Sequence, residues 1–268
     1  MADGRWLLGG AYMTLTFIDV LISASLVLVA IIVSWWLKLG LARTLIVASI
    51  RTIVQLSLIG LILAWVFARE SMVEVLTILS AMTIIAAISA KNRVKKPYQG
   101  LLIDTLIALG VATFAVTLVA MLLILQVSPW YAPQYIIPIL GLILGNSLTA
   151  ISLTTGRLIE HLHEQQSQIR TLLALSATPF EACHRAMATA ISAGMLPTIN
   201  SMMVVGLVSL PGMMTGQILA GANPTQAVRY QIVTMFLICA GSTISCTLSA
   251  VFVIRRFFDK QDRLVIPK

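Results

Sequence analysis

Seven apolar runs, each about as long as a helix needs to cross a bilayer (~20 residues), constrain this chain more than any other feature. They occupy residues 17–37, 44–67, 72–90, 101–127, 135–155, 198–220 and 230–254. Because lipid offers no hydrogen-bond partners, a spanning segment must satisfy its own backbone groups, and segments of this length do so as α-helices. We therefore predict an all-α fold, a polytopic transmembrane helical bundle with about seven spans, in a single domain covering residues 1–268.

The composition excludes a soluble domain, because 59% of the residues are hydrophobic and only 10% are charged. The net charge of +8 does not indicate nucleic-acid binding, since the basic residues lie in short connections between the apolar runs. Three cysteines without a CxxC spacing indicate small buried side chains rather than a disulfide framework. The N-terminus lacks the features of a cleaved signal peptide, so we expect the first run to be retained.

The positions of the basic residues predict the orientation in the membrane. Of the 18 lysines and arginines, Arg5, Arg69 and Arg229 lie on one side, Arg51 lies within a run, and the rest lie in connections on the other side. Since basic connections remain in the cytoplasm, we predict an inner (plasma) membrane protein with its N-terminus outside. The C-terminus and the connection 157–197 are then cytoplasmic.

The connection 157–197 is the only long polar segment. Its pattern predicts two helices with a sharp break between them, the second ending near Leu196-Pro197. Thr178 can cap this second helix, with Pro179 at its first position and Glu181 three residues after the cap, which is a capping box. A short, capped helix is a rigid projection that a partner protein can hold. The alternative is a connector that lies on the membrane surface.

Polar residues within the spans are candidates for a translocation path. Arg51 and Gln55 share one helix face, and the alternative for Arg51 is a structural ion pair or a side chain that reaches the headgroups. Asn146 and Asn200 are further candidates, with interhelical hydrogen bonding as the competing role. Asp19 and Asp104 lie near span ends, and we interpret both carboxylates as lying at the membrane interface.

The sixth run contains Pro211-Gly212 near its middle, which predicts a kink or break. Irregular backbone at membrane depth is tolerated inside protein or beside a water-filled cavity, so the break indicates a translocation path or a purely structural kink. Two GxxxG pairs, Gly141–Gly145 and Gly212–Gly216, predict close helix packing. Met213 and Met214 belong to a set of twelve methionines whose thioethers could contact a soft metal, although packing is their usual role.

Motifs for catalysis or nucleotide binding are missing. The sequence has no GxxxxGK[ST] loop, no HExxH and no GxSxG, so we predict that this chain is not an enzyme. His161 and His163 point to different helix faces, and Cys183-His184 are adjacent, so neither pair is a good chelate. The metal ligands, if any, are unknown from the sequence.

Two stretches are specific enough to indicate a family, namely Gly206-Leu-Val-Ser-Leu-Pro-Gly-Met-Met-Thr-Gly-Gln-Ile-Leu-Ala-Gly221 and Ala227-Val-Arg-Tyr-Gln-Ile232. In them the chain resembles the FetB-type permeases, which are bacterial iron-export ABC transporter subunits with plant aluminium-tolerance relatives. Arg51-Thr-Ile-Val-Gln-Leu56, Ile137-Pro138, Gly145-Asn146 and Leu175-Ser-Ala-Thr-Pro179 also match. Asn200 and Met203 stand where some bacterial relatives carry an acid and a lysine, and plant-like members carry the asparagine.

The resemblance implies a permease subunit, as a homodimer or pseudo-dimer, that pairs with a separate cytoplasmic ABC ATPase and exports iron or another metal ion. ATP would bind the partner, with no cofactor on this chain. The ATPase contacts would come from Ser176, Thr178, Pro179, Phe180, Glu181 and Arg185. The path residues would be Arg51, Gln55, Asn146, Asn200, Pro211, Gly212, Met213 and Met214, with packing at Gly141, Gly145 and Gly216.

Other functions stay open on the sequence alone. An ABC permease could carry a non-metal solute, such as the nucleotide sugar proposed for a plant relative. A secondary transporter would favour paired acidic residues at mid-membrane, and the spans contain no such pair. An intramembrane enzyme would need a catalytic constellation, which the sequence does not present.

Overall fold

The computed structural model describes residues 17–69, 71–259 and 261–265. The regular secondary structure of these residues is helical, as the apolar runs predict. Two isolated β-bridges are present and there is no sheet among these residues. The α-helices are α1 (Phe17–Trp36), α2 (Ala42–Arg69), α3 (Met72–Arg93), α4 (Leu101–Val119), α5 (Pro133–Glu164), α6 (Gln166–Ala174), α7 (Pro179–Val204), α8 (Gly212–Leu219) and α9 (Pro224–Phe257). A π-helical turn, Ala120–Ile124, extends α4.

Prolines begin three of the longest helices, at the first position of α5, α7 and α9. A proline costs nothing at that position because its missing N–H would have no intrahelical partner. The side chain of Asn223 caps α9 by accepting the N–H of Thr225 at 2.9 Å. These local signals position the starts of the helices that form the centre of the bundle.

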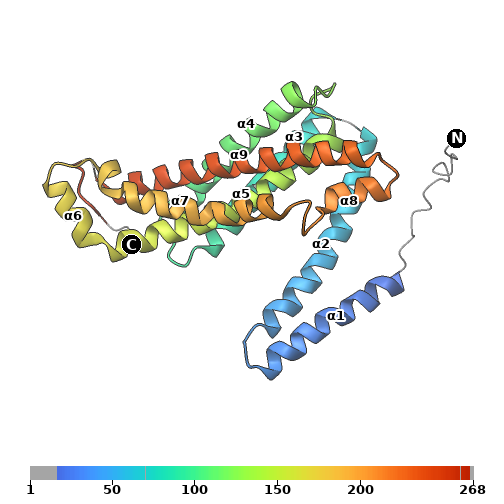
Figure 1. Ribbon diagram of the computed structural model, residues 1–268, viewed down its shortest axis with the longest axis horizontal. Coiled ribbons are helices and arrows are strands. Elements are labelled where there is room, and N and C mark those ends of the chain that lie inside the picture. Colours follow the sequence, from blue (N-terminus) through green and yellow to red (C-terminus); the bar gives the residue numbers. More distant parts are fainter. Residues whose placement is uncertain (1–16, 70, 260, 266–268) are drawn as a thin grey trace.

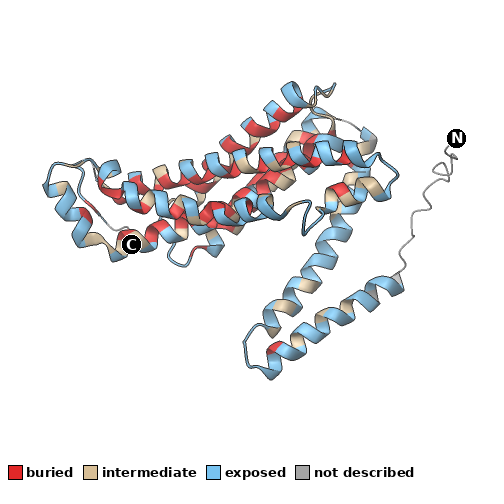
Figure 2. Cartoon of the chain, viewed as in Figure 1, coloured by how far each residue is buried: buried red, intermediate tan, exposed pale blue. Residues whose placement is uncertain are grey.

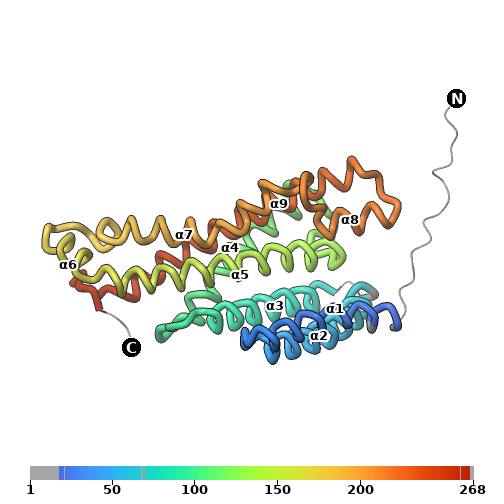
Figure 3. Tube along the Cα trace, turned by 60° about the horizontal axis from the view of Figure 1, so that its bottom comes forward, coloured from blue at the N-terminus to red at the C-terminus, as the bar shows by residue number. Residues whose placement is uncertain are grey.

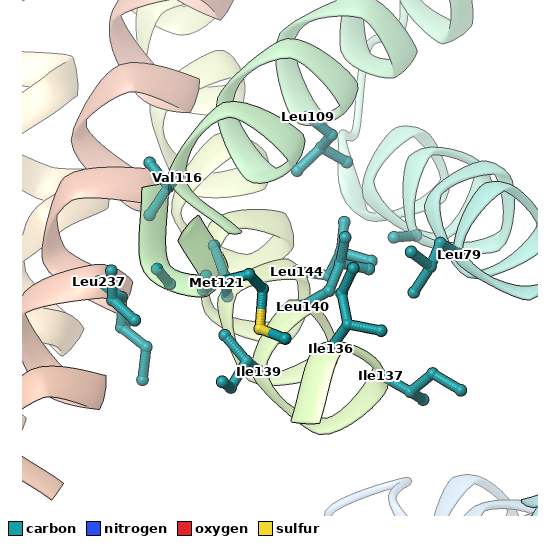
Figure 4. Packing of buried hydrophobic residues seen from close by; sticks show 14 of the residues in the cluster. Leu79, Leu109, Val116, Met121, Ile136, Ile137, Ile139, Leu140, Leu144 and Leu237 are labelled. Carbon is teal, nitrogen blue, oxygen red and sulfur yellow. The ribbon is translucent and has the colours of Figure 1, made fainter. Parts of the chain in front are cut away.

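The bundle is built around α5, which packs against α3, α4, α7 and α9. In Figure 3, α5 runs between α3 on one side and α7 and α9 on the other. One apolar core joins α3, α4, α5 and α9 with the end of α2 at Val66, and Figure 4 shows part of it, where Leu109 and Leu140 lie between Leu79 on one side and Leu237 on the other. A second core joins the far ends of α5, α7 and α9 around Phe257.

Two glycines allow the central helices to approach closely. A Cβ atom at Gly194 of α7 would collide with the Thr154 hydroxyl and the Ala150 carbonyl of α5. A Cβ at Gly241 of α9 would lie 2.5 Å from Cγ2 of Ile143. Neither glycine belongs to a GxxxG pair, so the sequence analysis did not single them out.

The predicted packing glycines have fewer neighbours within this chain. A Cβ at Gly141 would lie 3.2 Å from Cε of Met82, which places α3 against this face of α5. No heavy atom of the described residues would lie within 4 Å of a Cβ at Gly145, Gly212 or Gly216. Close helix packing at these three glycines stays a prediction.

The hairpin of α1 and α2 diverges from the bundle (Figure 1). Val66, near the end of α2, is the one buried residue among the described side chains of that helix, and in the most apolar window of α1 only 6% of the residues are buried. Figure 2 shows this as an almost entirely exposed pair of helices. A surface this apolar is stable only in lipid or against another protein, which agrees with membrane-spanning helices.

Within the described residues, six helices are long and apolar enough to cross a membrane, namely α1, α2, α3, α4 with its π-helical turn, α5 and α9. The predicted sixth span, 198–220, is wrong as a single helix, because α7 ends at Val204 and α8 begins only at Gly212. Together α7, the break and α8 lead from the end of the bundle at α6 to the start of α9 (Figure 1). This segment therefore runs along the bundle without forming one continuous helix.

The predicted structure of the polar segment also needs correction. Helix α5 does not end near Thr155 but continues to Glu164, and the 26-residue α7 passes through Pro197 without ending there. The second helix is therefore the start of a long helix rather than a short projection. Packing against α5 and α9 stabilises α7 along its length, which outweighs the hydrogen bond lost at Pro197.

Candidate functional site

The interruption between α7 and α8 arises from local chemistry. Gly206 adopts φ +84°, a left-handed conformation that ends α7 after Val205 and favours glycine. Its N–H donates to the Ser209 carbonyl at 2.9 Å instead of continuing the helical ladder. Pro211 then stands as N-cap of α8. The break expected at Pro211-Gly212 is present, and it is longer than expected, covering residues 205–211.

A cavity of about 280 Å³ opens beside this break; we call it the break cavity. Residues of α5, α7, α8 and α9 and the interrupted backbone line it. Its walls are Leu142 and Asn146 of α5, Thr198 and Ser201 of α7, Val205, Ser209 and Pro211 of the break, Gly212 and Met213 of α8, and Gln231, Thr234, Met235 and Ile238 of α9. None of these side chains carries a formal charge, so the cavity is polar but neutral.

The polar groups of the break cavity are only partly satisfied. The Asn146 amide donates to the Leu142 carbonyl of its own helix at 2.8 Å, rather than to another helix. The Thr234 hydroxyl donates to the Tyr230 carbonyl at 2.8 Å. Gln231 is only 7% exposed, and its Oε1 has no hydrogen-bond partner among the described residues. A buried amide oxygen without a hydrogen bond destabilises a fold, so Gln231 is a polar side chain that the packing of this chain does not fully satisfy.

Four of the predicted path residues meet at this cavity, namely Asn146, Pro211, Gly212 and Met213. The other four do not line it. Arg51 and Gln55 are exposed on α2, and Arg51 takes part in none of the ion pairs found in the described residues. Asn200 is exposed on α7, and Met214 is buried but lines neither this cavity nor its neighbour. A transport role for these four stays a prediction.

The sequence analysis missed Gln231, Thr234, Thr198, Ser201 and Ser209. The apolar pattern places the start of the last span at Tyr230, so Gln231 is predicted to lie at the edge of that span. The helix starts at Pro224, so Gln231 lies two turns inside it. The signal that could have found it is Asn223-Pro224, a cap residue followed by proline, which marks the true helix start.

The turn between α6 and α7 forms the predicted capping box. The Glu181 N–H donates to the Thr178 hydroxyl at 3.3 Å, and the Thr178 N–H and hydroxyl each donate to Glu181 Oε2 at 2.8 Å. These two bonds to Thr178 lower the pKa of Glu181. The ionised Glu181 carboxylate therefore stabilises the folded start of α7 at pH values above the ordinary carboxyl pKa. This stabilisation is lost as the pH falls through the lowered pKa of Glu181. Ser176, at φ +68°, makes the turn sharp.

The predicted coupling residues share this turn. Ser176, Thr178, Phe180, Glu181 and Arg185 are exposed, with the Phe180 side chain presented to solvent at 41% exposure. A groove of about 680 Å³ separates the turn from the C-terminal tail. The C-terminal tail lines this groove with Gln261, Asp262, Arg263 and Leu264, opposite Arg170 and Leu173 of α6. The sequence pattern did not predict that the tail belongs to this surface.

Asp104 lies inside the protein rather than at an exposed interface. It is 6% exposed, and Arg256 of α9 donates to both of its oxygens at 3.1 Å. The Tyr98 hydroxyl donates to the same carboxylate at 2.8 Å, and burial, followed by this bond, raises the pKa of Tyr98. A Cβ at Gly100, where φ is +95°, would lie 3.0 Å from the Arg256 guanidinium. This network fixes the α3–α4 connection to the end of α9.

Clusters of conventional metal ligands are not found in the part of the chain that the structure describes. No three His, Cys, Asp or Glu side chains there are close enough to hold an ion together. Among the described residues the His161 nitrogens have no hydrogen-bond partner, although Nδ1 lies 4.0 Å from Glu164 Oε2, and His163 Nδ1 lies 2.7 Å from the Ile159 carbonyl. The polar cavity at the helix break and the exposed capped turn are therefore the two candidate functional features.

Comparison with known proteins gives a family for nearly the whole chain. The model of the family described as "Uncharacterised protein family (UPF0014)" matches residues 17–258. A UPF0014 membrane protein of Synechocystis is 40% identical over 88% of this chain and 92% of its own length. The probable iron export permease protein FetB of Escherichia coli is 34% identical over 90% of this chain and 92% of its own. Protein ALUMINUM SENSITIVE 3 of Arabidopsis thaliana is 33% identical, covering 89% and 86%. No solved structure matches the chain.

Proposed function

Because this chain belongs to the UPF0014 family of multi-pass membrane proteins, we propose that it is the membrane-spanning permease subunit of an ATP-driven transporter. One observation carries the proposal: a helix inside the bundle is interrupted, and the interruption opens on a neutral polar cavity. Interrupted helices at membrane depth occur where backbone lines a solute path. The cargo is iron or another metal ion, a choice supported by the printed name of the Escherichia coli relative.

The energy source in this proposal is a separate cytoplasmic ATPase, with this chain as half of a permease homodimer. The sequence has no phosphate-binding loop of its own. The capped α6–α7 turn offers a rigid, exposed contact at the end of the bundle that also holds the C-terminal tail. The same helix, α7, continues to the break at Val204, so a displacement of the turn is transmitted along it to the cavity.

The orientation in this proposal has the α6–α7 turn in the cytoplasm. A Ser167→Cys variant, in a chain whose native cysteines are replaced, is expected to react with a membrane-impermeant maleimide only after the cells are opened. Ser167 is exposed on α6 among the basic connections. An Ala222→Cys variant, exposed in the connection at the opposite end, is the matched control and should react in intact cells. The reverse labelling pattern would overturn the orientation.

The transport path is tested by filling the break cavity. Gly212 lines it, and a Cβ there would meet no heavy atom within 4 Å, so a side chain can begin at this position and Gly212→Leu is the variant that adds bulk to the cavity wall. We expect ATP-dependent metal uptake into inverted vesicles, with the cognate ATPase present, to fall by at least about tenfold, a barrier increase of about 1.4 kcal/mol. Ala220→Leu, exposed at the end of α8 and outside the cavity, is the control. Equal transport by both variants would remove the support for this path.

A further inference from the structure

A cavity of about 470 Å³ lies further along α5 than the break cavity, and we call it the basic cavity. The end of α3, the connection from α3 to α4, the later part of α5 and one residue of α7 line it. Four of the lining residues are basic, namely Arg93, Lys95, Lys96 and Arg157. Neither the break cavity nor the capped turn includes any of them.

One of these four charges is balanced within the cavity. Glu160 and Glu164 are its acidic lining residues. Arg157 Nη1 lies 2.6 Å from Glu160 Oε2, so this pair of charges offsets itself. Glu164 is then the one carboxylate left to balance the other basic residues.

The three remaining cations have no carboxylate partner. Arg93 donates to the Thr149 hydroxyl at 3.2 Å, which is a neutral acceptor. Neither Arg93 nor Lys95 nor Lys96 takes part in an ion pair within the part of the chain that the structure describes. The basic cavity therefore has an excess of positive charge, and an anionic group is the ligand that its charge favours.

The basic cavity lies level with the membrane boundary. Along α3, Arg93 is about 32 Å from the first residue, Met72. Along α5, Ser152, the first cavity residue of that helix, is about 28 Å from Pro133. The hydrocarbon core of a bilayer is about 30 Å thick, so both helices place the cavity where the core meets the lipid headgroups.

The lining changes from apolar to charged in the direction away from the membrane. On α5, Leu153 is 45% exposed, and Arg157 follows one turn further out on the same helix face. Gly156 lies between them, and no heavy atom of the described residues lies within 4 Å of a Cβ there, which leaves room along this wall. Lys95 and Lys96 lie beyond the end of α3. An anionic phospholipid has the same order of apolar and charged parts.

A protein partner fits this position less well than a lipid does. Ser152 is about 18 Å closer to the membrane than Glu164, the last residue of α5. The α6–α7 turn, where we place the ATPase, follows only after Glu164 and the whole of α6. A protein would have to enter the headgroup region to reach the basic cavity, whereas a lipid is already there.

We propose that the basic cavity binds the headgroup of an anionic phospholipid, with Arg93, Lys95 and Lys96 supplying the counter-charge to its phosphate. Basic pockets between membrane helices on the cytoplasmic side hold such headgroups in other membrane proteins. The bound lipid connects the α3–α4 connection to α5 and therefore stabilises the folded protein. The inference goes beyond the proposed function and does not depend on which solute is transported.

The site is tested by melting the purified full-length chain in a neutral detergent while phosphatidylglycerol or phosphatidylcholine is added. Phosphatidylglycerol at saturation should raise the melting temperature by at least about 5 °C, and phosphatidylcholine should raise it much less. In a Lys95→Gln/Lys96→Gln variant, half of the rise should need at least about tenfold more phosphatidylglycerol, because two charged contacts to the phosphate are lost. Its melting temperature without lipid should equal that of wild type, because neither lysine is in an ion pair among the described residues.

The matched control is Lys38→Gln/Arg43→Gln. These two basic residues belong to the connection between α1 and α2 and lie outside the basic cavity. The control removes the same charge from the chain, so it measures the general attraction of basic residues to anionic lipid. It should retain most of the response of wild type to phosphatidylglycerol.

Gly156→Leu tests the cavity while every charge is retained. The added side chain begins in open space and adds bulk to the α5 wall, so it should also weaken the response to phosphatidylglycerol at least about tenfold.

Three results would overturn the inference. Equal responses to the two lipids, or an equal loss in the Lys38→Gln/Arg43→Gln control, would leave only general attraction to a membrane surface. A wild-type response in Gly156→Leu would show that the lipid does not enter the cavity. A rise of the same size with inorganic phosphate in place of lipid would identify a soluble phosphate compound as the ligand.

Discussion

A Gly194→Ala variant is expected to lose the native bundle, although alanine is the best helix former and Gly194 lies inside a helix. The added methyl group would collide with the hydroxyl of Thr154 and with the backbone carbonyl of Ala150. The hydroxyl can rotate away but the carbonyl cannot, so α5 and α7 must separate. Overpacking of a well-packed core costs about 1–3 kcal/mol, and contact with rigid backbone places this change at the upper end or beyond.

The measurement is the yield of monodisperse protein in detergent and its melting temperature. Gly156→Ala is the matched control, because Gly156 lies on α5 with no heavy atom within 4 Å of a Cβ. There the higher helix propensity of alanine should stabilise the protein by up to about 1 kcal/mol. A Gly194→Ala protein as stable as Gly156→Ala would show that α5 and α7 are not in this close contact.

A Phe180→Ala variant is expected to insert into the membrane normally but to lose ATP-driven transport. Phe180 is a large aromatic side chain, 41% exposed, beside the capped start of α7. A rigid, exposed aromatic residue is the kind of anchor whose loss costs about 2 kcal/mol or more at a protein interface. Recovery of a tagged ATPase with the variant should therefore fall at least about tenfold.

Glu181→Ala tests the same surface through the backbone. Without the carboxylate, the Thr178 N–H loses its acceptor and the first turn of α7 loosens, so both ATPase recovery and transport should fall. Phe236→Ala is the control for both variants, because Phe236 is an exposed aromatic residue on the apolar surface of α9. Undiminished ATPase recovery and transport in Phe180→Ala and Glu181→Ala would favour a connector that merely lies on the membrane surface.

The sequence alone determined the elements that depend on nearby residues. The apolar runs correctly predicted an all-helical bundle and the approximate positions of six long helices, because each spanning helix satisfies its backbone by itself. Thr178, Pro179 and Glu181 correctly predicted a capping box, since its partners lie within three residues of one another. Pro211-Gly212 predicted a break for the same local reason.

Only the tertiary structure decided how far helices extend and which faces meet. Pro197 reads as a helix end, yet α7 continues through it because α5 and α9 hold it on both sides. Gly194 and Gly241 belong to no motif, and their importance depends on Thr154 and Ile143, which are distant in sequence. Gln231 reads as a residue at the edge of a span, and it becomes a cavity residue only once α8 folds against α9. Apolar pattern and capping act within a few residues, whereas cavities and close contacts arise from pairs of helices whose relative rotation no local pattern specifies.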